Sequence, residues 1–325
     1  MNLIFDGNYL FHVAFSVFST YYRGKDMSEV LQDKEAQQVL LRKCIIDLCH
    51  TVNRFTDIDR VIITIDSSSW RYNLYANYKY SLTKVRDNYY KYFLQCLYMF
   101  EDFMRNKGFI VSRVDGCEGD DLIYIWSLYY GYCENEETVI ITGDSDLRQL
   151  ITDKVSVFCN NSKYLKMYCM QCNELEWNDR LDSDIQVVTT DPFEILLYKV
   201  ILGDGSDNIP KIKSGFGEKG FQKFLQTIKP YNQPKDVDII KMASWIADRL
   251  SKYLFTEYED TFGKVLFNLK MVWLNVAAYN ECEFISEDGR PLLAHMLDNI
   301  IQNRDNYKYK GEYSLENIYG MLIKK

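Results

Sequence analysis

The stretch Val61-Ile62-Ile63-Thr64-Ile65 runs directly into Asp66 and indicates how the chain folds. A short run of β-branched residues such as this is typical of a buried strand. Two further apolar runs, Leu3 to Phe5 and Val139 to Thr142, also lead into acidic residues. Because these runs alternate with helical stretches, we predict an α/β fold with a mostly parallel central sheet.

Helices are expected between these strands, on both faces of the sheet. Residues 35–55 carry an apolar residue at every fourth position from Leu40 to Val52, which places these side chains on one helical face. Further helices are predicted over residues 88–107 and from Glu118 onward. A strand is predicted at 109–114.

A second, helix-rich region is predicted in the C-terminal part of the chain. Between about 155 and 185 the alternation of apolar strands and helices weakens, and the sequence is polar and typical of hairpins. From Pro192 onward the pattern is mainly helical. Two of the expected helices cover 237–255 and 262–275. We therefore expect a core at 1–185 and a helical C-terminal region at 186–325.

Composition argues against membrane, secreted and zinc proteins. No apolar run of about 18 residues occurs and no basic segment precedes Asp6, so we expect neither a membrane span nor a signal peptide, and a cytoplasmic location. The nine cysteines are odd in number and unevenly spaced, so reduced thiols are expected. Cys169 and Cys172 form a CxxC pair, but without a second pair or nearby histidines they do not favour zinc.

The net charge of −8 is unevenly distributed. Between Trp70 and Tyr92 there are five basic residues and one acidic residue, and between Lys211 and Lys223 there are four lysines and one glutamate. These two basic patches could hold a phosphate backbone, although the chain as a whole is acidic.

The acidic residues that follow the predicted strands form the main candidate site. Ligands of open α/β sheets bind at the carboxyl ends of the strands, where the connecting loops gather. A single acidic residue there is usually a helix cap or a turn residue, but a converging set would repel itself without cations. Because carboxylates without histidine or thiolate favour magnesium or manganese, we predict two divalent ions. The candidate ligands are Asp6, Asp66, Glu118, Asp120, Asp121, Asp144, Asp146, Asp204 and Asp207.

A glycine-rich turn follows Pro210. Gly215, Gly217 and Gly220 match the dinucleotide-binding pattern GxGxxG, but no β-branched strand precedes them, so we reject that interpretation. A turn between two helices fits better, because backbone N–H groups at the start of the second helix hold phosphate without reading bases. The candidate nucleic-acid contacts are Lys211, Lys213, Gly215, Gly217, Lys219 and Lys223.

The segment from Trp70 to Lys79 (WRYNLYANYK) interleaves aromatic rings with cations. Bases stack on such rings while phosphates pair with the cations, so the segment suits single-stranded nucleic acid, with Tyr75 and Tyr78 as candidate contacts. The alternative is a solvated helical insertion whose tyrosines pack together. The acidic residues predicted beside the segment favour the first interpretation.

Together these motifs resemble the flap endonuclease and 5′-nuclease superfamily, most closely the replicative enzymes of phages, including the RNase H of T-even phages. The resemblance covers residues 1 to about 230 and rests on Asp6, on Asp66 followed by Trp70 to Lys79, and on three acidic motifs. These motifs are Glu118 to Asp121 (ExDD), Gly143 to Asp146 (GDxD) and Gly203 to Lys219 (GDxxDNIPxxxGxGxK). The resemblance implies a helical arch at about 68–105 and a helix-hairpin-helix element at about 192–228.

The resemblance also implies roles for the acidic residues. The tighter metal site would consist of Asp6, Asp66, Glu118 and Asp120, and the second site of Asp144, Asp146 and Asp207. Asp120 or Asp121 would lie between the two sites, and Asp204 would support them. A potassium ion would bind at the hairpin turn.

Lys79 matches the family lysine that reaches the scissile phosphate, and Arg71 and Lys84 are candidates for similar work. The sequence departs from the family at two positions. Ala76 stands where proline is common, and Leu82 stands where an arginine is usual. Lys84 or Arg86 would then supply the second basic group.

We therefore expect a magnesium-dependent phosphodiester hydrolase, with manganese as a substitute, that leaves a 5′-phosphate and a 3′-hydroxyl. Its expected substrates are DNA with a 5′ flap or nick and RNA primers in RNA:DNA hybrids, as in phage lagging-strand replication. A phage single-strand-binding protein or a sliding clamp would be its partner, and the chain would be a monomer. Two alternatives stay open: a PIN-type single-strand endoribonuclease and a non-catalytic nucleic-acid-binding protein.

Overall fold

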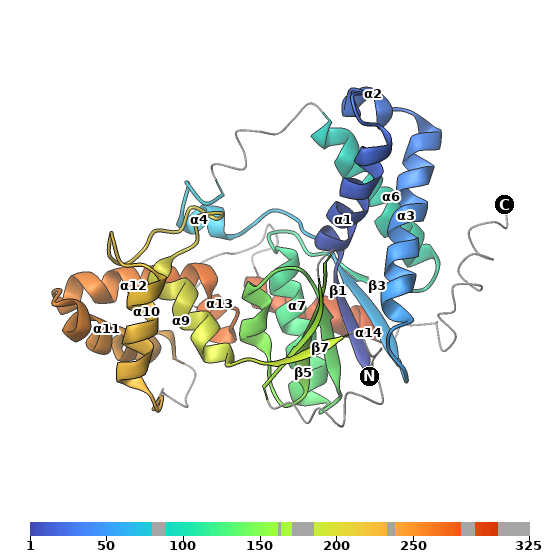
Figure 1. The fold of residues 1–325 in the computed structure, drawn as a ribbon. Helices are drawn as coiled ribbons and strands as arrows, with labels where there is room; N and C mark the ends of the chain where they lie inside the picture. The colour runs from blue at the N-terminus through green and yellow to red at the C-terminus, as the bar shows by residue number, and fades with distance from the viewer. Residues whose placement is uncertain (80–88, 162–163, 171–184, 233–237, 281–289, 305–325) are drawn as a thin grey trace. The chain divides into compact units, whose positions relative to one another are not determined.

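The computed structural model of the chain describes residues 1–79, 89–161, 164–170, 185–232, 238–280 and 290–304 (Figure 1). The chain divides into two compact units. Unit 1 comprises residues 1–68, 86–190 and 296–325, and unit 2 comprises residues 69–85 and 191–295.

Unit 1 is built on a seven-stranded sheet with the strand order β3-β2-β1-β4-β5-β6-β7. Its neighbouring strands are parallel except for the antiparallel pair β5 and β6. The predicted mostly parallel sheet is therefore confirmed. The strands are β1 (Asn2–Asp6), β2 (Arg60–Thr64), β3 (Ile110–Ser112), β4 (Thr138–Ile141), β5 (Val155–Asn161), β6 (Tyr164–Cys169) and β7 (Gln186–Thr189).

Helices cover both faces of this sheet because its central strands are apolar on both sides. Leu3 and Phe5 point to one face and pack in a cluster with residues of α1 (Gly7–Tyr21), α3 (Lys34–Val52) and α6 (Tyr90–Asn106). Ile4 alternates with them and is equally buried. On that other face α7 (Gly119–Ser127) packs against β1, β2 and β4. The remaining helical segments of this part are α2 (Met27–Val30), the π-helix η1 (Leu128–Cys133) and the 3₁₀ helix η2 (Asp146–Leu150).

Unit 2 is helical, which confirms the helix-rich C-terminal region. Asp191 caps its first long helix by accepting a hydrogen bond from Phe193 N, with Pro192 in the first turn. Leu197, Ile246 and Leu269 lie in its apolar core. The helices of unit 2 are α4 (Arg71–Leu74), α9 (Pro192–Leu202), α10 (Glu218–Ile228), α11 (Ile239–Leu254), α12 (Tyr258–Val272) and α13 (Val276–Asn280). Helix α14 (Leu292–Arg304) begins in unit 2 and belongs to unit 1 from Met296 onward.

The two units differ from the predicted division at 185/186 in three places. Strand β7 extends the sheet to Thr189, because it pairs in parallel with β6. Residues from Met296 return to unit 1, where Ser112 Oγ donates to Asn299 Oδ1 at 2.6 Å. Residues 69–85, which lie within the predicted core and its arch at 68–105, group with unit 2, whereas α6 packs in unit 1, where Phe93, Leu97 and Phe100 are buried.

Two expectations from composition bear on the described residues. None of the helices in these ranges is long and apolar enough to span a membrane. The thiols of Cys44, Cys49, Cys96, Cys117, Cys133 and Cys159 are free, but Cys169 is disulfide-bonded, so the expectation of reduced cysteines is wrong for Cys169. Cys172 lies outside the described residues.

Candidate active site

Three carboxylates of unit 1 follow neighbouring parallel strands. Asp6 ends β1, Asp66 lies two residues after β2, and Asp144 lies three residues after β4. Because β2, β1 and β4 are adjacent and parallel, their carboxyl ends lie at one edge of the sheet. The structure therefore brings these three predicted ligands to the same edge.

Asp6 is held by its own helix and by the end of β4. One carboxylate oxygen accepts from Tyr9 N at 2.9 Å, which caps α1, and the other accepts from Thr142 Oγ1 at 2.8 Å. The same Thr142 hydroxyl accepts a hydrogen bond from Asp144 N at 3.0 Å. Thr142 thus links two candidate ligands, a role that sequence reasoning missed although this residue closes the VIIT run.

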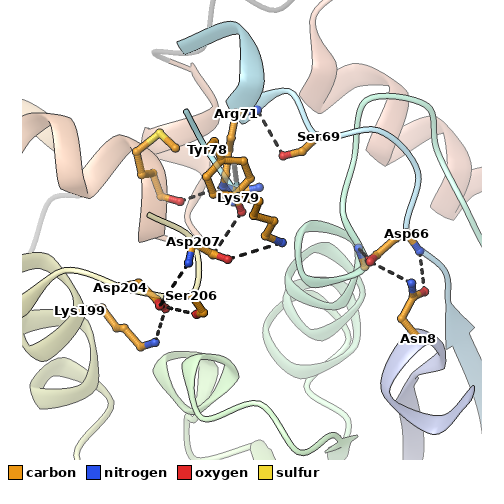
Figure 2. A network of polar contacts seen from close by, with 12 residues as sticks. Asn8, Asp66, Ser69, Arg71, Tyr78, Lys79, Lys199, Asp204, Ser206 and Asp207 are labelled. Atoms are coloured by element: carbon orange, nitrogen blue, oxygen red, sulfur yellow. Dashed lines mark hydrogen bonds and ion pairs between the residues drawn. The ribbon is translucent and has the colours of Figure 1, made fainter. Parts of the chain in front are cut away.

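Asp66 is fixed by Asn8 and Gly119, as Figure 2 shows for Asn8. Asn8 Nδ2 donates to Asp66 Oδ2 at 2.9 Å, and Asp66 N donates back to Asn8 Oδ1 at 2.9 Å. Gly119 N donates to Asp66 Oδ1 at 2.6 Å. A Cβ at position 119 would lie 2.9 Å from that oxygen, so the close approach requires glycine. Asn8 was also missed, because a polar residue in the first turn of a helix carries no distinctive signal.

The ExDD motif forms the start of α7. Glu118 and Asp121 make a reciprocal capping box, in which Glu118 N donates to Asp121 Oδ2 at 2.9 Å. Asp121 is fully buried, so it serves the helix start rather than an open ligand position. In the GDxD motif, Asp146 N donates to Asp144 Oδ1 at 2.8 Å, and the Asp144 residue is exposed.

Electrostatics show that the carboxylates of unit 1 converge. Burial raises the pKa of Asp120 well above its ordinary value, and the negative charges of Asp6, Asp144, Asp66 and Glu118 raise it further. Burial also raises the pKa of Asp6 to about 6, although hydrogen bonds from Tyr9 and Thr142 act in the opposite direction. Uncompensated negative charge is therefore concentrated around Asp120.

The chemistry of this donor set fits a divalent cation. The converging groups are carboxylates, the hard oxygen ligands that magnesium and manganese prefer. A cation would offset the repulsion that raises the pKa of Asp120. Within the described ranges, no group of three or more His, Cys, Asp or Glu side chains is already arranged to hold an ion. The fit therefore rests on the type of donor and the electrostatics, not on preformed coordination.

In unit 2, Asp204 organises the acidic loop that follows α9 (Figure 2). Lys199 Nζ donates to Asp204 Oδ2 at 2.6 Å, and the backbone N and hydroxyl of Ser206 donate to Asp204 Oδ1. Burial raises the pKa of Asp204, but the hydrogen bonds from Lys199 and Ser206 outweigh burial and lower it to about 2. Both oxygens are thus engaged by α9 and by the loop itself, and the supporting role implied for Asp204 at the metal sites stays a prediction.

Asp207 is bound to the segment that contains Lys79. Lys79 N donates to the Asp207 carbonyl at 3.1 Å, and Lys79 Nζ lies 3.9 Å from Asp207 Oδ1. Tyr78 OH donates to Asp207 Oδ2 at 3.3 Å (Figure 2). Asn208 Nδ2 adds a hydrogen bond to the Asn77 carbonyl at 2.9 Å. Two motifs about 130 residues apart in sequence therefore form one polar network.

The other candidates of the aromatic segment are packed rather than open. Tyr78 is 2% exposed, and the ring of Tyr75 packs on Phe267 at 5.4 Å. Arg71 is 3% exposed, and its Nε donates to the Met271 carbonyl at 2.8 Å. These placements show that the segment is neither a solvated insertion nor an open binding surface at Tyr78 and Arg71, and they argue against a phosphate contact by Arg71. Lys84, Leu82 and Arg86 lie outside the described residues.

The glycine-rich turn joins α9 to α10, as predicted. Gly215 has a φ of +77° and Gly217 caps α10. Lys211, Lys219 and Lys223 are exposed. The ammonium group of Lys213 is engaged by the Leu254 carbonyl, to which it donates at 2.9 Å.

A mostly parallel sheet with carboxylates gathered at neighbouring strand ends, and a helical unit that carries a lysine-containing turn, is typical of α/β hydrolases that act on phosphodiesters. Within that class, residues 1–176, more than half of the chain, match the family described as 5'-3' exonuclease, N-terminal resolvase-like domain, and the chain belongs to this family. The chain is therefore an enzyme, a phosphodiester hydrolase, and the resemblance to the 5′-nuclease superfamily is confirmed.

Three similar proteins illustrate this relationship. A 5'-3' exonuclease of Mycoplasmopsis pulmonis is 26% identical over 275 residues, which span 84% of this chain and 80% of the relative. A solved bacteriophage T5 5'-exonuclease with bound divalent metal ions (zinc) has a TM-score of 0.60 at 19% identity, covering 93% of this chain and 99% of that chain. A bacteriophage T5 flap endonuclease with DNA and metal ions has a TM-score of 0.57 at 18% identity, covering 94% and 100%. At these identities the two T5 structures establish the fold alone.

Proposed function

We propose that this protein is a divalent-metal-dependent 5′-nuclease that removes 5′ flaps and RNA primers from DNA during replication, leaving a 5′-phosphate and a 3′-hydroxyl. The observation that carries the proposal is the convergence of four negative charges on Asp120 at the carboxyl edge of the sheet. Family membership supports the choice of end, since the family and the Mycoplasmopsis pulmonis relative are both named for 5'-3' exonuclease activity. The T5 flap endonuclease solved with DNA and metal ions supports the substrate class.

Two magnesium ions, or manganese in their place, are the proposed cofactors. Asp6, Asp66, Glu118 and Asp120 would hold one ion, and Asp144, Asp146 and Asp207 the other. When bound, the ions would activate water and stabilise the charge on the leaving oxygen. Because water is the nucleophile, no covalent intermediate with the protein is expected. A potassium ion at the turn from Lys213 to Gly217 is a further part of the proposal.

The residues of the chain itself would position the reacting groups. Thr142 and Asn8 fix the orientation of Asp6 and Asp66 through their hydrogen bonds. Lys79 would supply positive charge to the scissile phosphate, from a backbone position held by Asp207. The exposed lysines of the turn and the N-terminus of α10 would hold the duplex by its phosphates, as a helix-hairpin-helix element does. We further propose that the protein works in the cytoplasm as a monomer.

The test is cleavage of end-labelled substrates by matched variants. Wild type, Asp144→Asn and the control Asp153→Asn would be incubated with magnesium or with chelator on 5′ flaps, nicked duplexes, RNA:DNA hybrids and single strands. Asp153 is an exposed carboxylate of unit 1 outside the proposed site. We expect wild type and Asp153→Asn to cleave near 5′ ends only with magnesium. Asp144→Asn should bind but not cleave.

Three results would contradict the proposal. We call the sheet edge that carries Asp6, Asp66 and Asp144 the acidic edge. Cleavage by Asp144→Asn at a rate near that of wild type would show that the acidic edge is not the catalytic site. Magnesium-dependent cutting of single-stranded RNA without need of a 5′ end would favour the PIN-type endoribonuclease. Binding without turnover by wild type would favour a non-catalytic protein.

A further inference from the structure

Phe255 is an unusual residue at the end of α11. Its side chain is 95% exposed, and its backbone is left-handed with φ 53° and ψ 50°. Helices commonly end on such a residue, but it is usually glycine or asparagine, because a Cβ and a bulky side chain are strained there. A phenyl ring that stays in water adds no stability through burial. Glycine or asparagine would remove the backbone strain at no loss of packing, so the ring is better explained by a contact than by folding.

The surroundings of Phe255 connect it to the glycine-rich turn. Lys213 Nζ donates to the carbonyl of Leu254, the residue before Phe255, at 2.9 Å. The ring of Phe216 in the turn packs edge-on against the ring of Tyr253, with the two ring centroids 6.2 Å apart. The turn and the end of α11 therefore form one surface of unit 2, which we call the turn–Phe255 surface: residues 211–219 and 253–255.

The charges of this surface favour a polyanion. Lys211 and Lys219 are exposed, and Glu218 is the acidic residue of the turn. The carboxyl end of a helix carries partial negative charge that would repel phosphate, but the Lys213 ammonium offsets it at α11. Three acidic residues follow Phe255 at the N-terminus of α12, where the helix dipole accounts for them: Glu257, Glu259 and Asp260, the last of which also pairs with Lys264.

We propose that Phe255 is a DNA-contacting residue, whose ring packs against the sugars and base edges of the strand that the turn holds by its phosphates. Apolar and stacking contacts of this kind add affinity without reading sequence. The lysines would supply the salt-dependent part of binding and Phe255 a part independent of salt. This inference rests on the proposed function, because it assumes that the turn binds the DNA substrate.

The experiment measures binding of a labelled 5′-flap duplex by fluorescence anisotropy, in the presence of chelator and at several salt concentrations. The full chain would be compared with Phe255→Asn, Phe255→Trp, Lys219→Ala and Ile240→Ala. Asparagine tolerates the left-handed backbone, so Phe255→Asn should melt at or above the wild-type temperature. Ile240 is the matched control, since it is 43% exposed at the opposite end of the same helix, about 22 Å away along the axis.

We expect Phe255→Asn to bind about 5- to 30-fold more weakly, with an unchanged slope of log affinity against log salt. Phe255→Trp should bind at least as tightly as wild type, Ile240→Ala should be unchanged, and Lys219→Ala should reduce the slope by about 1. Wild-type affinity in a folded Phe255→Asn variant would overturn the inference, and so would a reduced salt slope in that variant. If wild type itself fails to bind the flap duplex, the proposed function falls, and this inference with it.

Discussion

Replacing Lys199 with methionine removes the cation that holds Asp204 while keeping a long apolar side chain. Lys199 and Asp204 are 16% and 9% exposed, so water can take the place of the lost partner only in part. The Asp204 pKa of about 2, against an ordinary value of 3.8, corresponds to about 2 kcal/mol of folding free energy, since one pH unit is worth about 1.4 kcal/mol. Because the hydrogen bonds from Ser206 supply part of this shift and remain in the variant, we expect Lys199→Met to lose about 1 to 2 kcal/mol at pH 7.

The pH dependence distinguishes this electrostatic loss from a loss of packing. A lowered carboxyl pKa adds stability above the ordinary value of 3.8, and this stability disappears as the pH falls towards 2. The difference between wild type and Lys199→Met should therefore narrow from pH 5 downward. The difference in unfolding free energy between the two proteins is measured by urea unfolding, monitored by circular dichroism, at pH 7, 5 and 3.5.

Lys252→Met is the matched control for this experiment. Lys252 pairs with Asp248 at 2.6 Å, but the two side chains are 74% and 47% exposed. An exposed pair of this kind contributes little, so the variant should unfold at nearly the wild-type urea concentration. A Lys199→Met variant as stable as wild type at pH 7, or one whose deficit is the same at every pH, would refute the reasoning.

Three further outcomes are expected from the acidic edge. Burial raises the pKa of Asp6 to about 6, so ionisation of Asp6 destabilises the metal-free fold as the pH rises from about 4 to about 6. Magnesium should therefore raise the melting temperature more at pH 7.5 than at pH 5. Equal shifts of the melting temperature at the two pH values, measured by calorimetry, would contradict this. Thr142→Val removes the hydroxyl that links Asp6 to Asp144, so it should lower the free energy of unfolding by about 1–2 kcal/mol and slow cleavage. The control Thr138→Val, at the start of β4, should leave the cleavage rate unchanged. Gly119→Ala should displace Asp66 and weaken magnesium binding in calorimetry, whereas Gly263→Ala, where a Cβ meets open space within α12, should stabilise the protein by up to about 1 kcal/mol.

The position of the acidic edge could be predicted from sequence because it follows from simple geometry. Parallel strands bring their carboxyl ends together, so Asp6, Asp66 and Asp144 could be grouped before any contact was known. The residues that hold them could not be found in this way. Asn8 meets Asp66 across 58 positions and Thr142 meets Asp6 across 136, so both contacts depend on strand register and helix placement.

The aromatic segment was harder to interpret because exposure is not encoded in residue type. Tyr78 and Arg71 have the chemistry of nucleic-acid contacts, but both are buried, with their polar atoms bound to Asp207 and to the Met271 carbonyl. A ring or a guanidinium group serves packing and binding equally well, and only its neighbours decide between them. The division into units was missed for a related reason, since short excursions of the chain leave no compositional boundary.

Those excursions constrain how the protein can be taken apart. The backbone passes between the two units after residues 68, 85, 190 and 295, so no single cut separates them. A fragment ending at Thr190 would keep Trp70 and Tyr78, which are 1% and 2% exposed in the whole chain, without the helices of unit 2 that cover them. It would also lose the residues from Met296 onward that belong to unit 1. Deletion mapping would therefore yield aggregation-prone, poorly folding fragments. Circularly permuted or internally spliced chains are better suited to assigning activity to either unit.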